Sequence, residues 1–210
     1  MMNIWIWAGA AFLYLIFALW YFNWKGPLTA DEIDKYVELI STSQSPTDTE
    51  VIRKFLEEDD GKEFIMLNLV RFHEGKIEHP DTGEKTDGQA LVQDYLEPFM
   101  KALFKRGGHP VILSRKRGGY IDSWNASADE GFQVVGSMRY RSRRDMMILV
   151  TDPRFGDSHK YKLAAIDGTI SFPTQSFMST FLSPKIWVAL LLILLASLAQ
   201  NVLFFFELRK

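Results

Sequence analysis

The chain has 210 residues and a formal net charge of -2, so neither its length nor its overall charge singles out one class of partner. It contains no cysteine, which excludes disulfides, thiolate catalysis and cysteine-ligated zinc or iron–sulfur centres. The charge is uneven: residues 29–100 carry 18 acidic and 7 basic side chains, and residues 101–170 carry 13 basic and 7 acidic ones. We expect these halves to pair within one domain, and the acidic half argues against nucleic acid as a partner.

Two long runs of apolar residues, 4–22 and 186–206, contain no charged side chain. A helix rises about 1.5 Å per residue, so each run can cross a hydrocarbon core of about 30 Å. We therefore predict a retained membrane anchor over residues 1–25 and a second membrane helix over residues 184–208. Amphipathic rings favour the level of the lipid head groups. Those at the ends of the first run are Trp5, Trp7, Trp20, Tyr21 and Trp24.

Two amides, Gln200 and Asn201, interrupt the last third of the second apolar run. They either meet water near the membrane surface or contact another helix, within a dimer or in a second integral membrane subunit. Lys25 directly follows an N-terminal tail without charged side chains, which favours a cytoplasmic position for the polar middle of the chain. We expect an integral protein of a bacterial inner membrane, in contact with lipid.

Residues 26–62 are predicted to form an amphipathic helical linker. Thr29 and Glu32 have the spacing of a capping box and precede a helical pattern of apolar residues. Thr47 and Glu50 repeat that spacing before a second amphipathic stretch. These two helices would pack beside the core of the following domain or lie against the bilayer.

Residues 63–178 are predicted to form an α+β domain with the order β-α-β-β-α-β, the pattern of a ferredoxin-like sandwich. In that pattern the first and last strands pair antiparallel, so the chain enters and leaves the sheet at one end. Ser142 begins the second helical region, which is broken and restarted at Asp152-Pro153. The expected strands cover residues 64–72, 109–117, 131–140 and 168–175.

A family resemblance is carried by the strand Met66-Leu67-Asn68-Leu69, by Tyr95 with Gly107-Gly108, and by Tyr140-Arg141-Ser142-Arg143-Arg144-Asp145 followed by Phe155 and His159. In these residues the chain resembles the dimeric α+β barrel superfamily, especially its small uncharacterised members. The superfamily includes antibiotic-biosynthesis monooxygenases, haem-degrading enzymes and lactone isomerases, so the fold does not fix the chemistry. The resemblance implies a homodimer that pairs sheet to sheet and carries four membrane helices.

The same resemblance implies two candidate site residues. Haem-degrading members place an Asn on the first strand and a His on the last helix around one pocket, and Asn68 and His159 occupy those positions. Leu149 stands where those enzymes carry a Trp. His159 lies in an apolar helical stripe, where it is either a haem ligand, a proton-transfer group or a core histidine. The stripe comprises Phe155, His159, Leu163 and Ile166.

Arg139, Arg141 and Arg143 form a basic cluster that could hold an anionic ligand or substrate. The residues give no complete catalytic set and imply no metal or cofactor, so the sequence does not decide whether the chain is an enzyme. We expect a membrane-anchored, non-catalytic accessory, assembly or small-ligand-binding subunit of a membrane complex. The alternative is a haem-binding or monooxygenase-type enzyme that uses Asn68 and His159.

Overall fold

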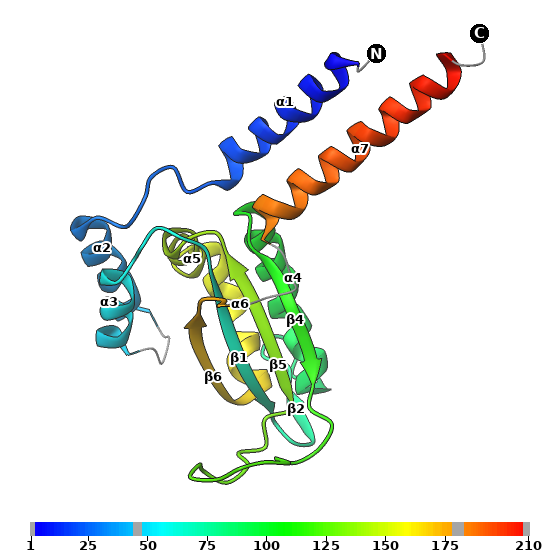
Figure 1. Ribbon diagram of the computed structural model, residues 1–210. Helices are drawn as coiled ribbons and strands as arrows, with labels where there is room; N and C mark the ends of the chain where they lie inside the picture. The colour runs from blue at the N-terminus through cyan, green and yellow to red at the C-terminus, as the bar shows by residue number, and fades with distance from the viewer. Residues whose placement is uncertain (1–2, 44–47, 178–182, 208–210) are drawn as a thin grey trace. The chain divides into compact units, whose positions relative to one another are not determined.

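The computed structural model describes residues 3–43, 48–177 and 183–207, with only the backbone described at residues 154–156 (Figure 1). A four-stranded antiparallel sheet has the strand order β4-β5-β1-β6. Ile65 pairs with Thr174, so the chain enters and leaves this sheet on neighbouring strands, as predicted. The α+β class is confirmed. The strands are β1 (Phe64–Phe72), β4 (His109–Arg115), β5 (Val134–Tyr140) and β6 (Ile166–Thr174).

The third strand of the sheet begins later than the sequence suggests. We predicted a start at residue 131, and β5 begins at Val134. Gly131 adopts a φ of 75°, a left-handed conformation that ends the preceding loop and is incompatible with a strand.

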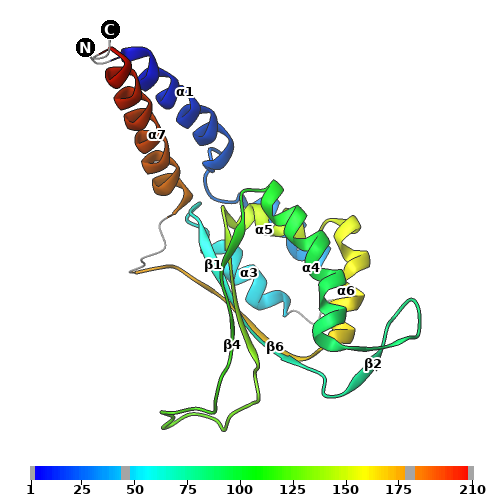
Figure 2. The ribbon, with the colours of Figure 1, turned by 90° about the vertical axis from the view of Figure 1, so that its right-hand side faces the viewer.

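Three helices lie on one face of the sheet: α4 (Gly88–Lys105), α5 (Arg143–Val150) and α6 (Pro153–Ala165) (Figure 2). The Ser142 hydroxyl accepts the first-turn N–H of Asp145, as expected for the N-cap of α5. The chain breaks between α5 and α6 at the predicted Asp152-Pro153. Leu149 is 1% exposed in the core.

Residues 26–62, predicted as a linker, belong to the same compact unit as the sheet. The capping box at the start of α2 (Ala30–Ser41) is present: the Glu32 N–H donates to the Thr29 hydroxyl, and the Thr29 N–H donates to the Glu32 carboxylate. Ile33 and Tyr36 of α2 are buried against Tyr140 and its neighbours in the core. Packing beside the core is therefore the arrangement found for α2.

The next helix, α3 (Thr49–Glu57), begins at an N-cap that the sequence did not suggest. Thr47, the expected cap, lies outside the described residues. Asp48 is the N-cap, and its carboxylate accepts the backbone N–H groups of Glu50 and Val51. Leu56, near the C-terminal end of the helix, is fully buried in the core.

A short hairpin of β2 (Lys76–Glu78) and β3 (Lys85–Asp87) leaves the sheet after β1. Its turn is fixed to α6 because the Asp81 carboxylate accepts hydrogen bonds from Lys160 and Tyr161. On the other side, the His79 Nε2 lies 3.2 Å from a carboxylate oxygen of Asp94 on α4. The hairpin is therefore attached to both helices that cover the sheet face.

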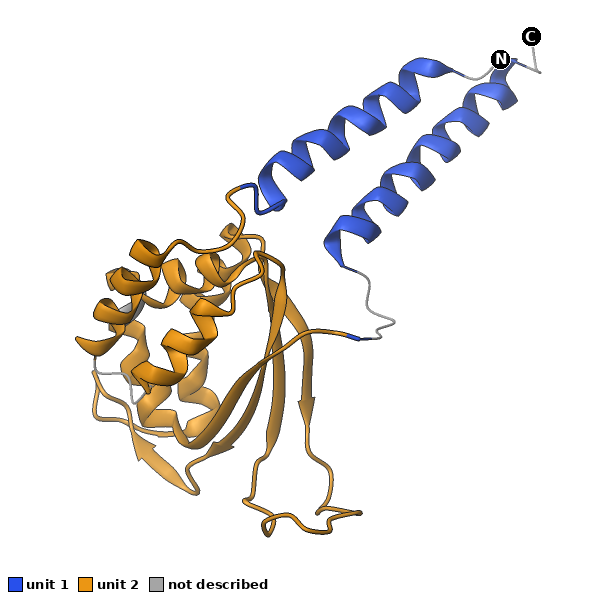
Figure 3. Cartoon of the chain, turned by 60° about the vertical axis from the view of Figure 1, so that its left-hand side comes forward, with its two compact units in different colours: residues 1–24, 177–210 blue, residues 25–176 orange. Residues whose placement is uncertain are grey.

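The second compact unit consists of residues 1–24 and 177–210, coloured blue in Figure 3. Its helices α1 (Ile4–Tyr21) and α7 (Pro184–Glu207) are both long and apolar enough, by length and composition, to cross a membrane. They run antiparallel: the Tyr14 hydroxyl donates to the Lys185 carbonyl at 2.9 Å, and the Asn3 N–H donates to the Gln200 Oε1 at 2.6 Å. One partner of the Gln200 amide is thus the backbone at the N-cap of the chain's own first helix.

Candidate functional site

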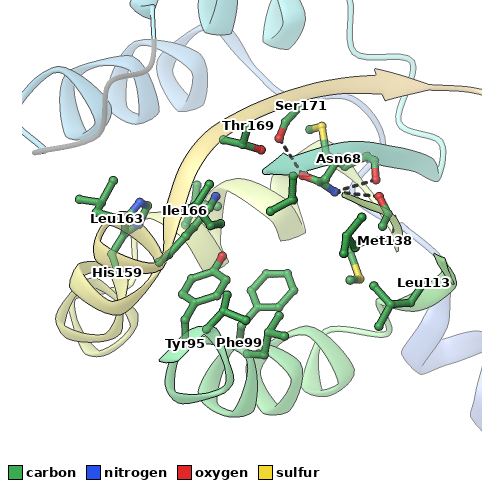
Figure 4. A pocket seen from close by; sticks show the side chains of 18 of the residues that line it. Asn68, Tyr95, Phe99, Leu113, Met138, His159, Leu163, Ile166, Thr169 and Ser171 are labelled. Carbon is green, nitrogen blue, oxygen red and sulfur yellow. Dashed lines mark hydrogen bonds between the residues drawn. The ribbon is translucent and has the colours of Figure 1, made fainter. Parts of the chain in front are cut away.

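A cavity of about 1300 Å³ lies between the sheet and the helices of residues 25–176 (Figure 4). Ligand pockets usually range from about 300 to 1,000 Å³, so this space is large enough for a drug-sized molecule. Alternate residues of β1 and β5 face it, because successive side chains of a strand point to opposite faces. The cavity-facing residues of these two strands include Met66, Asn68, Val70, Val134, Gly136 and Met138.

The opposite wall of the cavity is formed by α4 and α6. Tyr95 and Phe99 of α4 stack with their ring centroids 5.5 Å apart, as Figure 4 shows. Leu163 of α6 and Ile166, the first residue of β6, add apolar side chains to the lining. The cavity is therefore mostly apolar, and its few polar side chains can decide which ligand it accepts.

Asn68 is the polar residue in the middle of the apolar face of β1. Its Nδ2 donates to the carbonyls of Met66 and Gly136 at 3.2 and 3.3 Å, and its Oδ1 accepts the Ser171 hydroxyl at 2.7 Å (Figure 4). These bonds connect β1, β5 and β6 and use both N–H groups of the amide. The structure places Asn68 at the cavity wall, with only its oxygen able to accept one more hydrogen bond.

His159 lines the same cavity from α6, so the structure brings it and Asn68 to one space. Its ring lies edge-on to Tyr95, with 6.2 Å between the centroids. Burial lowers the pKa of His159, and the positive charge of Lys162 lowers it further. The imidazole is therefore neutral at neutral pH, the form in which it can accept a proton or bind a metal. The Phe155 side chain, predicted to share this helix face, lies outside the described residues.

Lys162 is a cavity residue that the sequence reasoning missed. Its Nζ lies 5.6 Å from the ring centroid of Tyr95. Burial lowers the pKa of Lys162, because the charged ammonium loses contact with water. Its position three residues after His159 was a usable signal, since residues three apart share a helix face.

The basic cluster predicted from the sequence does not line the cavity. Arg139, Arg141 and Arg143 all pair with carboxylates of the same domain, so an anion would have to compete with these internal partners. Anion binding by these arginines stays a prediction. The pairs are Arg139–Glu63 at 3.3 Å, Arg141–Asp145 at 2.7 Å and Arg143–Asp59 at 3.5 Å.

Apolar side chains also reach the solvent on the face of the sheet opposite the cavity. Ile112 of β4 and Ile170 and Phe172 of β6 are 39%, 41% and 43% exposed. Leu67 and Leu69 of β1 pair directly with Phe172 and Ile170 and continue this surface, which we call the outer face. Exposed apolar side chains grouped on one face of a sheet can mark a protein interface.

No model of a known protein family and no curated protein matches the chain. Among solved structures, it is similar to the RPA0582 protein of unknown function from Rhodopseudomonas palustris, with 23% identity over 65% of this chain and 98% of that chain, and a TM-score of 0.52. A methylated RPA0582 protein gives 22% identity over 67% and 99% of the two chains, with a TM-score of 0.53. At this identity the likeness shows a shared fold alone.

A more distant solved structure is a putative antibiotic biosynthesis monooxygenase from Bacteriodes thetaiotaomicron. It is 10% identical over 58% of this chain and 96% of that chain, with a TM-score of 0.35. A similarity this low carries no inference about the fold or the activity of the present chain.

Proposed function

We propose that this chain is a membrane-anchored, ferredoxin-like protein whose cavity binds a small, mostly apolar molecule. The cavity itself carries this proposal: its volume is about 1300 Å³, and its walls are an apolar sheet face and two apolar helix faces. Large apolar cavities with a few polar groups are the usual form of small-molecule sites. Two helices long and apolar enough to span a bilayer, α1 and α7, would hold the domain at the membrane.

Binding is favoured over catalysis by the state of the polar groups. The Asn68 amide has donated both its N–H groups within the sheet, and the three predicted arginines are paired outside the cavity. A ligand-binding role needs no nucleophile activated by an adjacent base. The chain would then act as a ligand-binding or accessory subunit of a membrane complex.

Titration of full-length protein in lipid nanodiscs with 2-naphthamide, a neutral aromatic probe, tests the binding function, with empty nanodiscs as the reference. The Gly136→Leu substitution adds a side chain to the cavity wall, where a Cβ meets its nearest atom at an ordinary contact distance of 3.7 Å, and circular dichroism of the variant checks that it is folded. We expect the probe to bind and this variant to lose binding. The control is Val135→Leu, whose side chain lies on the outer face of the same strand. Absence of saturable binding to the unaltered protein would overturn the proposal.

A second candidate function is haem-binding or monooxygenase-type catalysis, because Asn68 and His159 line one cavity. The residues fit haem only in part. A neutral imidazole at His159 can ligate iron, whereas the Asn68 amide is already held by the sheet. Purified protein with a Soret band that disappears in His159→Ala would support this candidate, and a colourless preparation from haem-supplemented cells would contradict it.

Two further features of the proposal concern assembly and location. The outer face supports a homodimer that pairs sheet to sheet, with four helices in the membrane. Asn201 is exposed on α7, which supports a contact with a second membrane subunit.

We propose that the domain of residues 25–176 lies on the cytoplasmic side of the membrane. A reporter enzyme inserted at Gly118, in a loop where a Cβ meets no atom within 4 Å, would report on which side this domain lies.

A further inference from the structure

We infer that the ligand of this cavity is an acid with an apolar body, whose carboxylate pairs with the ammonium group of Lys162. This inference rests on the proposed binding function and adds the chemical class of the ligand. It starts from Lys162, a cavity-lining lysine whose ammonium group faces the aromatic ring of Tyr95.

The surroundings of Lys162 differ from those of other lysines in this domain. Lys76 and Lys101 reach Asp87 and Glu97 at 2.8 and 2.6 Å on the surface. For Lys162, by contrast, no carboxylate oxygen of the described residues lies within 4.0 Å of Nζ. Removing an ammonium from water without a counter-charge is unfavourable, so this lysine is left with an unmet electrostatic requirement.

The neighbouring side chains do not meet that requirement. Burial lowers the pKa of His159 and raises the pKa of the Tyr95 phenol, so both groups are neutral at neutral pH. Asp157 is the acidic residue among those that line the cavity, and its side chain is exposed to solvent. A carboxylate brought by a ligand would supply the missing charge, and it would also favour the protonated form of Lys162, whose pKa burial lowers.

The remaining walls define the rest of the ligand. Tyr95, Phe99, Leu163 and Met138 present rings and aliphatic chains to the cavity that Lys162 also lines. These surfaces favour an apolar body, because a hydroxyl group placed against them is left without a hydrogen-bond partner. A cationic ligand would be repelled by Lys162. The favoured class is therefore an aromatic or alicyclic carboxylic acid.

Calorimetric titration of the full-length protein in nanodiscs with two probes of the same shape tests this inference. The probes are 2-naphthoate, which is anionic, and 2-naphthamide, which is neutral, and empty nanodiscs correct for partitioning into lipid. A hydrogen bond to a charged group contributes about 1.5–3 kcal/mol, so we expect naphthoate to bind about tenfold more tightly or better.

Substitution of Lys162 identifies the group responsible for that preference. In Lys162→Met, which keeps the length and apolar stem of the side chain, naphthoate should lose its advantage while naphthamide binding is retained. Lys162→Arg should restore the preference. Lys101→Met, on the exposed side of α4, is the matched control and should bind both probes as the unaltered protein does.

The outcomes separate the two proposals. If neither probe binds the unaltered protein, the binding function itself fails. If naphthamide binds and naphthoate binds no more tightly, the binding function stands and the assignment of an acidic ligand is overturned. A preference for naphthoate that persists in Lys162→Met would also overturn the assignment, because another group would then hold the carboxylate.

Discussion

Replacement of Glu32 by glutamine tests the ion pair that joins α2 to α5. The Glu32 carboxylate accepts hydrogen bonds from the Nε and Nη2 of Arg144 at 2.8 and 2.9 Å. The same guanidinium donates to the carbonyls of Gly26 and Pro27, so it also fixes the segment that leads into α2. Glutamine keeps the size of the side chain and an oxygen for the capping box, so the variant removes the charge and replaces one of the two oxygens that accept from Arg144 with an NH2 donor.

The pKa of Glu32 gives the size of the expected effect. Hydrogen bonding to Arg144 is the main cause of its fall from 4.5 to about 2. At about 1.36 kcal/mol per pKa unit, this difference sets an upper limit of about 3.4 kcal/mol on the stabilisation at neutral pH. The Glu32 side chain is 31% exposed, so screening by solvent reduces the expected loss to about 2 kcal/mol. For a domain of this size, that loss lowers the melting temperature by about 4–8 °C.

Thermal unfolding of the full-length protein in detergent measures this loss through the near-ultraviolet circular dichroism of the buried Tyr36 and Tyr140. The folded-state pKa of Glu32 lies below its ordinary value of 4.5. The stabilisation from its charge is therefore complete above pH 4.5 and disappears as the pH falls towards about 2. Glu38→Gln, an exposed position on the same helix, should leave the melting temperature unchanged. A melting temperature for Glu32→Gln within about 1 °C of the unaltered protein at pH 7 would refute the reasoning.

Three further predictions address other contacts. A Cβ at Gly108 would lie 2.3 Å from Leu103 and 2.8 Å from a backbone oxygen, so Gly108→Ala should lower the free energy of unfolding by at least about 1 kcal/mol. Gly118→Ala, where a Cβ meets open space, should leave the free energy of unfolding unchanged. Equal melting temperatures for the two variants would count against this packing. Phe172→Glu on the outer face should convert a dimer to a monomer in mass photometry, and a monomeric unaltered protein would contradict the dimer. Asp81→Asn weakens the bonds to α6 and should speed amide exchange in the β2–β3 hairpin but not in β1, whereas unchanged exchange would show that other contacts hold the hairpin.

Local features of this fold could be predicted because their signals lie within a few residues. The capping box of Thr29 and Glu32 and the break at Asp152-Pro153 were both found where the sequence placed them. Each depends on side chain to backbone bonding or on the missing N–H of proline, which do not require knowledge of distant residues. The strand order followed from the sequence of apolar runs, with errors only at strand ends such as that near Gly131.

The polar groups of the site could not be predicted in the same way, because their state depends on other elements of the fold. The basic cluster around Arg139 predicts anion binding, but Arg139 is 6% exposed and pairs with Glu63, which lies before β1. Lys162 would ordinarily be assigned to the solvent side of a helix. Its spacing from His159 indicates the cavity side of α6, whereas the contact of its ammonium group with Tyr95 of α4 is evident only from the fold.

The pairing of β1 with β6 has a consequence for the order in which the domain is completed during synthesis. β1 bonds with β5 on one side and with β6 on the other, and the register joins Ile65 to Thr174 across more than half of the chain. Such a separation makes this pairing a late step, since the intervening chain must be ordered first. One edge of β1 therefore stays open until Thr174 has been made, shortly before the first residues of α7 at Pro184. An open edge can pair with another chain, so a ribosome stalled before β6 would release a product prone to aggregation.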